Sequence, residues 1–146
     1  MIEVLDERQC WELLRTQEVG RLAVAITNHP DIFPLNYVVD HGTIVFRTDE
    51  GTKLAAAVLG TAVAFEVDAE VTGSTWSVVI KGRAVEIDRM YELFDALELP
   101  LYPWQMGTKH CFVRIVPDAV TGRRFLIADR AAHHTGEGPI RHSAPD

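Results

Sequence analysis

The sequence predicts a mainly β fold, an antiparallel barrel of about six strands with short flanking helices. Segments of β-branched and aromatic residues recur along the chain and are separated by turns rich in Gly, Pro, Asn and Asp. Most of the connections are too short for a crossover helix, which favours antiparallel pairing. With 146 residues, 47% of them hydrophobic, the chain fits one globular domain, and a closed or partly closed barrel would protect its strand edges.

The N-terminal part is predicted to form one helix and three strands. Asp6 is a suitable N-cap, and apolar residues at helical spacing continue the helix to about Thr16. The strands that follow are residues 19–26, 34–40 and 43–48. Residues 27–31 form a turn, and His41-Gly42 is a short turn that should join the second and third of these strands in a hairpin.

The second half of the chain alternates short helices with longer strands. Residues 53–59 are rich in Ala and Leu and predict a helix that ends at Gly60, and residues 89–97 predict a helix with one apolar face. The predicted strands are residues 61–67, 76–87 and, as one strand or two, 110–127. Gly82, inside a long β-run, indicates a bulge or a close approach of another backbone segment.

The domain organisation follows from where apolar periodicity is present. We expect residues 1–130 to form a single domain and residues 131–146 to form a C-terminal tail that is flexible or draped over a partner. The N-terminus has early acidic residues and no basic flank before a long apolar segment. We therefore expect no signal peptide, no membrane span and a cytoplasmic location.

Charge and cysteine content exclude several classes of site. The net charge of −7 argues against nucleic-acid binding, which needs many basic contacts to phosphates. Cys10 and Cys111 form no C-x-x-C pair and are expected to be reduced core thiols. His110 is adjacent to Cys111, but neighbouring strand residues point to opposite faces, so no metal site is predicted there. His133-His134 in the tail could bind metals only weakly.

The strand-to-helix junction at residues 44–54 has the composition of an anion site. The first turn of a helix exposes backbone N–H groups and carries partial positive charge. Gly51 allows a ligand to approach the backbone, Thr52 offers a hydroxyl group, and Arg47 and Lys53 add two cations. A phosphate group would be stabilised here. The alternative is an ordinary capped surface helix whose charged neighbours face water.

The order of motifs resembles the pyridoxamine 5′-phosphate oxidase-like family of FMN-binding split barrels. The resemblance covers most of residues 5–128. Its segments are Val19-Gly20-Arg21-Leu22-Ala23, Pro34-Leu35-Asn36-Tyr37, Phe46-Arg47-Thr48 with Gly51-Thr52-Lys53, and Trp76 through Ala84. It implies a six-stranded Greek-key split β-barrel, a homodimer with FMN in a cleft between subunits, and in many members oxidoreductase activity on a small molecule.

The resemblance implies which residues bind the cofactor. The Arg47-Thr48 strand end and the Thr52-Lys53 helix start match the family's phosphate-binding segment. Leu35, Asn36 and Tyr37 match the strand that lies along the isoalloxazine ring, where backbone amides can bond its polar edge. Because side chains alternate along a strand, only one of Asn36 and Tyr37 needs to contact a ligand.

Further contacts are implied near the second half of the chain. Trp76 and Ser77 match the position from which the other subunit closes over the flavin, although Trp76 could equally be a core aromatic residue. Trp104 and Arg124 loosely resemble the family's C-terminal flavin-facing segment.

The leading functional hypothesis is an FMN-dependent oxidoreductase acting on a small molecule, with no catalytic residue assigned. The chain lacks a recognisable match to the C-terminal Arg and His arrangement with which vitamin B6 oxidases hold their substrate's phosphate. It is therefore more similar to the short, functionally varied branch of the family. The alternatives are a deazaflavin-dependent reductase, a non-catalytic carrier of flavin or haem, and an interaction module that binds none of these ligands.

Overall fold

The computed structural model describes residues 2–49, 54, 58–87 and 110–126. Within these residues, the elements are β1 (Ile2–Leu5), α1 (Glu7–Leu14), β2 (Val19–Ile26), β3 (His29–Asp40), β4 (Thr43–Asp49), β5 (Ala62–Val71), β6 (Ser74–Glu86) and β7 (His110–Leu126). The predicted helix 89–97, the tail 131–146 and most of the predicted helix 53–59 lie outside the described residues. At the end of the latter, Gly60 has a φ of +78°, a conformation suited to a residue just past a helix end.

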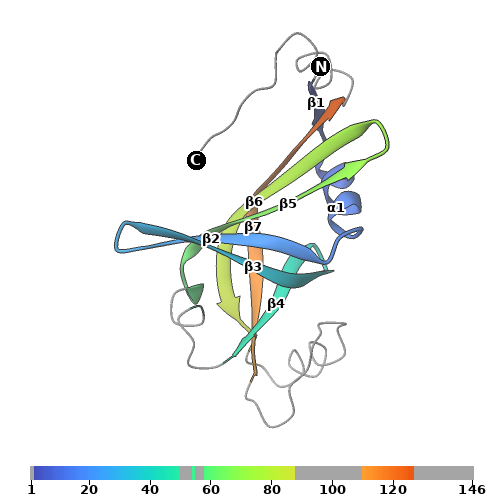
Figure 1. Cartoon of the computed structure of the whole chain (residues 1–146). Coiled ribbons are helices and arrows are strands. Elements are labelled where there is room, and N and C mark those ends of the chain that lie inside the picture. Colours follow the sequence, from blue (N-terminus) through green and yellow to red (C-terminus); the bar gives the residue numbers. More distant parts are fainter. Residues whose placement is uncertain (1, 50–53, 55–57, 88–109, 127–146) are drawn as a thin grey trace.

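Six of the strands form a closed antiparallel ring. The sheet order is β1-β7-β4-β3-β2-β5-β6, and an additional β6–β7 pairing closes it (Figure 1). Strands β2, β3 and β4 are consecutive neighbours, and β5 returns to pair with β2, which is the Greek-key arrangement. The predicted split-barrel architecture is thus confirmed, and the expected hairpin of the second and third predicted strands is the β3–β4 pair.

The strand number differs from the prediction by one. β1 is a seventh strand that pairs with β7 outside the ring, from Ile2 opposite Phe125 to Leu5 opposite Gly122. Four residues are too few for a recognisable β pattern. β3 also begins earlier than expected, at His29, because Thr27 and Asn28 alone form the turn with φ values of 48° and 66°.

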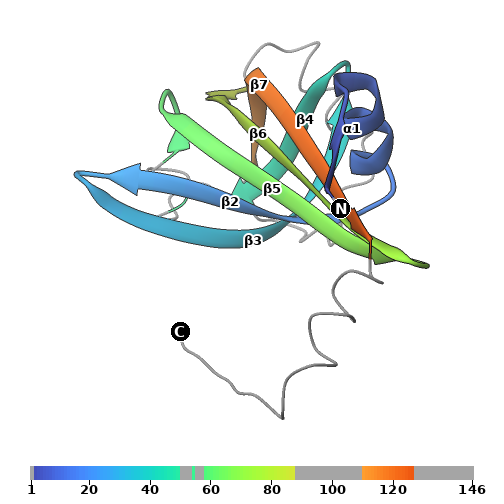
Figure 2. The ribbon, with the colours of Figure 1, turned by 90° about the horizontal axis from the view of Figure 1, so that it is seen from above.

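Helix α1 covers one side of the ring, beside β7 (Figure 2). Its N-terminus has the predicted cap: the Asp6 carboxylate accepts from Gln9 N at 2.8 Å, and Gln9 Oε1 accepts from Asp6 N at 2.8 Å. The buried side chains of Cys10 and Leu14 face the strands. A Cβ atom on Gly122 of β7 would lie only 2.6 Å from Cys10 Sγ, so this glycine is what lets the helix pack so closely.

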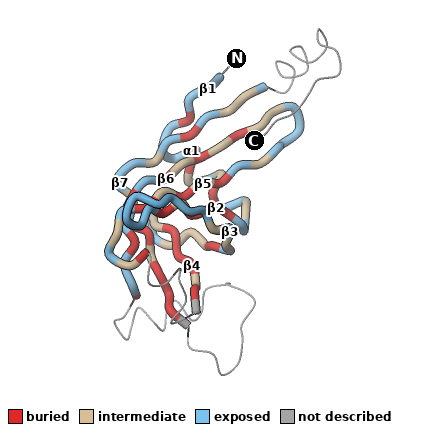
Figure 3. The backbone as a smooth tube through the Cα atoms, turned by 60° about the vertical axis from the view of Figure 1, so that its left-hand side comes forward, coloured by how far each residue is buried: buried red, intermediate tan, exposed pale blue. Residues whose placement is uncertain are grey.

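The hydrophobic core fills the inside of the ring, and β7 runs along the whole length of this core. Buried residues gather where the strands cross, whereas the β2–β3 hairpin tip is exposed (Figure 3). The last predicted β-region is one continuous strand through Pro117. Gly82 lies opposite Pro117 at a register shift, and a Cβ atom there would lie 2.2 Å from Val116 O, which confirms the predicted bulge and close approach.

Candidate functional site

The outer face of β3 and β4 carries two of the predicted cofactor-binding side chains. Tyr37 is paired with Phe46, and both side chains are buried in the core. Asn36 and Arg47 are each one residue beyond this pair, so alternation places both on the opposite, outer face. At Asn36, β3 leaves its pairing with β2 and continues along β4, so the two side chains lie where β3 passes from one neighbouring strand to the other.

The neighbours of Arg47 on the outer face of the sheet are apolar. Its cross-strand neighbour on β7 is Phe112, and Val45 precedes it on the same face of β4. Phe112 and Val45 are 2% and 0% exposed but are not part of the main core cluster, which lies on the other face. Thr48 faces the core opposite Cys111 and is 7% exposed, so of the two residues at this strand end Arg47 is the one on the outer face.

A cavity of about 440 Å³ opens beside Asn36, within the size range of small-molecule sites. Its lining combines residues of the α1–β2 connection with residues of β3: Leu14, Arg15, Gln17, Glu18, Asn36, Tyr37, Val38 and Val39. Sequence reasoning identified only Asn36 and Tyr37 of this set. Arg15, Gln17 and Glu18 follow a helix end and have no sequence pattern that separates them from ordinary surface residues.

Tyr37 connects β3 to the end of α1 and to the α1–β2 connection, all of which line the cavity. Its backbone N donates to Glu18 O at 3.0 Å, and its hydroxyl group donates to Leu14 O at 2.6 Å. The ring also makes an edge contact with Phe65, with centroids 5.1 Å apart. Burial raises the pKa of the Tyr37 phenol above its usual value. The Tyr37 side chain therefore serves the fold, and the neighbouring Leu35 also packs against the core.

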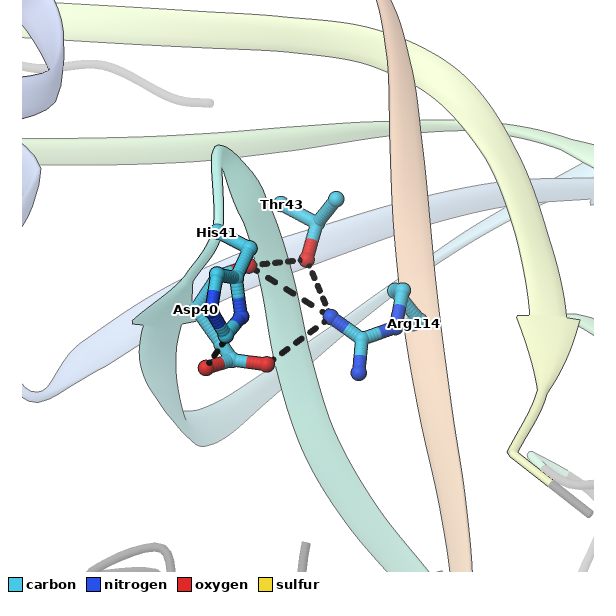
Figure 4. A network of polar contacts seen from close by, with 4 residues as sticks. All are labelled: Asp40, His41, Thr43 and Arg114. Atoms are coloured by element: carbon cyan, nitrogen blue, oxygen red, sulfur yellow. Dashed lines mark hydrogen bonds and ion pairs between the residues drawn. The ribbon is translucent and has the colours of Figure 1, made fainter. Parts of the chain in front are cut away.

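A polar network anchors the β3–β4 turn to β7 on the same outer face (Figure 4). Arg114 Nη1 donates to Asp40 Oδ2 at 3.0 Å and to Thr43 Oγ1 at 2.7 Å, and Thr43 Oγ1 donates to Asp40 O at 2.6 Å. His41 Nδ1 lies 3.1 Å from the other Asp40 carboxylate oxygen. The Arg114 and Asp40 side chains are only 17% and 18% exposed. This network fixes the two strands that carry Asn36 and Arg47.

The remaining predicted contacts lie at the far end of β7. Trp76 is opposite Arg124 on this strand, whereas Arg47 is opposite Phe112, 12 residues earlier. At the usual rise per strand residue this is about 40 Å along β7, and Figure 1 shows the strand running almost the full height of the molecule. The structure therefore brings Asn36 and Arg47 together and separates them from Trp76, Ser77 and Arg124 within one chain.

Local contacts define the role of each residue at that far end. Trp76 is 1% exposed and belongs to the core, and its indole N–H finds no hydrogen-bond acceptor among the described residues. Arg124 Nη1 lies 3.4 Å from Glu3 Oε1. Ser77 points to the outer face of β6, half-buried. Thr52, Lys53 and Trp104 lie outside the described residues.

Among the described residues, cysteine and metal-ligating side chains form no further reactive or metal-binding site. Cys10 and Cys111 are buried thiols that form no disulfide with each other, as expected. Burial, followed by the nearby Asp6 and Glu7 carboxylates, raises the pKa of the Cys10 thiol. Across residues 2–49, 54, 58–87 and 110–126, no group of three or more His, Cys, Asp or Glu side chains could hold a metal ion. In the same part of the chain, no helix has the length and apolar character needed to cross a membrane.

Comparison with known families gives a match over most of the chain. The family model described as pyridoxamine 5′-phosphate oxidase matches residues 6–124. This span includes every described strand except β1 and the last residues of β7.

Similar proteins include ones from Mycobacterium and Corynebacterium. The FAD binding protein of Mycobacterium smegmatis is 38% identical, with a TM-score of 0.79 over 85% of this chain and 98% of that one. A conserved protein of unknown function from Corynebacterium diphtheriae is 36% identical, with a TM-score of 0.75 over 86% of this chain and 98% of that one. The uncharacterized protein Rv0080 of Mycobacterium tuberculosis is 33% identical over 86% of both chains.

Proposed function

The chain belongs to the pyridoxamine 5′-phosphate oxidase family, and we propose that it binds a flavin nucleotide and uses it as an oxidoreductase acting on a small molecule. The observation that carries the proposal is the likeness to the FAD binding protein of M. smegmatis, at 38% identity across almost all of that chain. FMN and FAD share the riboflavin phosphate half, and Asn36 and Arg47 would bind that half. Which of the two nucleotides is preferred is a question for the binding experiment.

The site fits such a group in shape and in chemistry. The cavity of about 440 Å³ beside β3 can accept a planar ring, and the Asn36 amide at its edge offers both a donor and an acceptor. On the adjacent strand, the Arg47 guanidinium lies on the same outer face, where it can bind a phosphate through charge-assisted hydrogen bonds. The family resemblance adds Thr52 and Lys53 to this proposed phosphate site.

The chain's own residues have three tasks in this mechanism. Arg47 would hold the phosphate end, which fixes the position of the ring end along β3. Asn36 and neighbouring backbone N–H groups would donate to the polar ring edge, where negative charge develops on reduction. Val38, in the cavity wall, would exclude water. The bound flavin itself would supply hydride or electron transfer.

The same proposal includes a homodimer. Ser77 and Arg124 form a second group of predicted contacts, at the opposite end of β7 from the strand position of Arg47, whereas the Trp76 side chain is buried in the core. One flavin can contact both groups of residues only if the second group comes from another copy of the chain. A twofold dimer, the commonest oligomer symmetry, would supply it.

Visible absorption tests flavin binding directly. The purified protein is titrated with FMN and with FAD in separate experiments, and the unbound flavin is removed before each spectrum is recorded. We expect retained flavin bands, and we expect Arg47→Met to weaken binding at least about tenfold, because a charge-assisted contact is lost. Arg83→Gln, which removes an exposed charge elsewhere, is the control. Release of all FMN and FAD by the wild type would refute the proposal; deazaflavin binding or a Soret band would then favour the alternatives.

A second assay separates an enzyme from a carrier. The flavin-loaded protein is mixed with reduced nicotinamide and an electrophilic nitroaromatic acceptor under anaerobic conditions. Turnover above that of free flavin at the same concentration supports oxidoreductase activity. Tight flavin binding without turnover, with a panel of donors and acceptors, would instead identify a carrier.

A further inference from the structure

A second hollow, of about 310 Å³, lies on the outer face of β6 and β7, at the opposite end of β7 from Arg47. It is lined by Ser77 and Val79 of β6 and by Thr121, Gly122, Arg123 and Phe125 of β7. The strand register puts Ser77 directly opposite Arg123 and Val79 directly opposite Thr121, so these side chains share one face. The lining thus combines two hydroxyl groups and one guanidinium with apolar walls.

The polar groups of this hollow have no protein partners in the described part of the chain. Within residues 2–49, 54, 58–87 and 110–126, no hydrogen bond or ion pair involves the Ser77 hydroxyl, the Thr121 hydroxyl or the Arg123 guanidinium. Four other arginines differ, because each is paired with a carboxylate: Arg8 with Glu12, Arg21 with Glu66 and Asp68, Arg114 with Asp40, and Arg124 with Glu3. Arg123 therefore presents its positive charge and donor groups to whatever enters the hollow.

The two acidic side chains that lie opposite the β6 residues of this hollow interact with Arg21. The nearest acidic side chains by register are Asp68, opposite Ser77, and Glu66, opposite Val79. Both interact with Arg21, whose Nη1 lies 2.7 Å from Glu66 Oε1 and 3.3 Å from Asp68 Oδ1. On the other side of β7, the neighbour of Arg123 is Val4, which is 80% exposed. The β1 side of the hollow is therefore apolar.

We propose that this hollow binds the carboxylate of a small, partly apolar molecule, with Arg123 and Thr121 as the residues that select for the negative charge. A guanidinium can donate two parallel hydrogen bonds to a carboxylate, and the two hydroxyl groups can donate further ones. Val79 and Phe125 would contact the apolar part of the molecule. The identification of this ligand as the substrate rests on the proposed flavin function, since Ser77 is the residue expected to face the flavin of the partner subunit.

The test uses benzoate as an aromatic carboxylate and benzyl alcohol as its neutral analogue. Their affinities are measured by calorimetry and by NMR shifts at low ionic strength, with the full-length protein before and after loading with FMN. We expect benzoate to bind at least about tenfold more tightly than benzyl alcohol. Arg123→Gln should abolish that preference, Thr121→Val should weaken benzoate binding about fivefold, and Arg123→Lys should retain part of the preference. Arg83→Gln, on the same strand as Ser77, should leave benzoate affinity unchanged.

Several outcomes would overturn the proposal. If benzoate and benzyl alcohol bound equally tightly, the hollow would not select for negative charge. If inorganic phosphate bound as tightly as benzoate, the apolar walls would not contribute to binding. Displacement of benzoate by saturating FMN would assign the hollow to the flavin. Absence of benzoate binding, together with a changed sedimentation coefficient in Arg123→Gln, would make this face a subunit contact instead. Benzoate selectivity without flavin binding would uphold the anion site while refuting the proposed function.

Discussion

At the scale of single residues, Tyr37 and Asn36 show how neighbours on one strand divide the work of fold and site. Alternation along the strand predicts that one of the two faces the core, but it does not predict which. The choice depends on Leu14 O, an acceptor 23 residues away at the end of α1, which the Tyr37 hydroxyl reaches. A contact this distant in sequence has no local signal, whereas the exposed Asn36 on a β-run was already unusual by propensity.

The Tyr37 hydrogen bond should have a measurable effect on stability. Tyr37→Phe leaves Leu14 O buried without its donor, so we expect the free energy of unfolding to fall by about 1–2 kcal/mol in urea denaturation at neutral pH. Burial raises the pKa of this phenol, so its contribution is present below the ordinary tyrosine pKa of about 10 and is lost as the pH rises above it. The difference between wild type and Tyr37→Phe should therefore shrink at alkaline pH. A difference that stays constant up to pH ~11 would contradict this account.

At the scale of elements, the β6–β7 bulge is a feature that sequence alone predicted, because Gly82 interrupts a long β-run. A Cβ atom at this position would lie 2.2 Å from Val116 O and 2.9 Å from Pro117 Cα, both backbone atoms that cannot rotate away. We expect Gly82→Ala to destabilise the protein by about 2–3 kcal/mol, measured by urea denaturation. Lys81→Ala, at an exposed neighbouring position, is the control and should change stability by less than about 0.5 kcal/mol.

The β3–β4 turn depends on a side chain from the last strand, which the sequence did not reveal. Arg114 belongs to β7 but donates to Asp40 and Thr43 at the turn, 71 to 74 residues earlier. The turn itself could be predicted from His41-Gly42, because such dipeptides adopt the left-handed conformations seen here. Its attachment to β7 could not, since it requires the closed sheet. β1 was missed for the same reason: its identity comes from pairing with β7.

Removing the Arg114 network should affect both stability and the proposed site. Arg114→Met leaves the half-buried Asp40 carboxylate without its cation, so we expect a loss of about 2–3 kcal/mol in the free energy of unfolding. The double variant Arg114→Met with Asp40→Asn should be less destabilised than the sum of the two single variants. Flavin affinity should also fall, because β3 and β4 carry Asn36 and Arg47. Strictly additive effects of the two substitutions would show that the pair is not coupled.

At the scale of the whole molecule, the predicted site residues separate into two groups at opposite ends of β7. Short connections between β-type segments predicted an antiparallel barrel, and the family resemblance implied its Greek-key order. The junction chemistry also indicated Arg47 as a phosphate ligand candidate. The separation of Arg47 from Trp76 and Arg124 could not be seen in the sequence, because it follows from the cross-strand register. Alternation along β7 could have pointed to Thr121 and Arg123, which share the outer face with Ser77.

Subunit complementation tests this division directly. Arg47→Met and Ser77→Trp should each weaken flavin binding strongly, because the first removes a phosphate contact and the second blocks the face that covers the partner's flavin. If the two variants are unfolded together and refolded, random pairing gives heterodimers in which one of the two sites is intact, so about a quarter of all sites should bind flavin again by absorbance. The matched control combines Arg47→Met with Asn36→Ala, which damage the same half of the site and should restore nothing. No recovery in either mixture would mean that one chain alone forms the flavin site, and equal recovery in both would mean that Arg47 and Asn36 do not belong to the same half of the site.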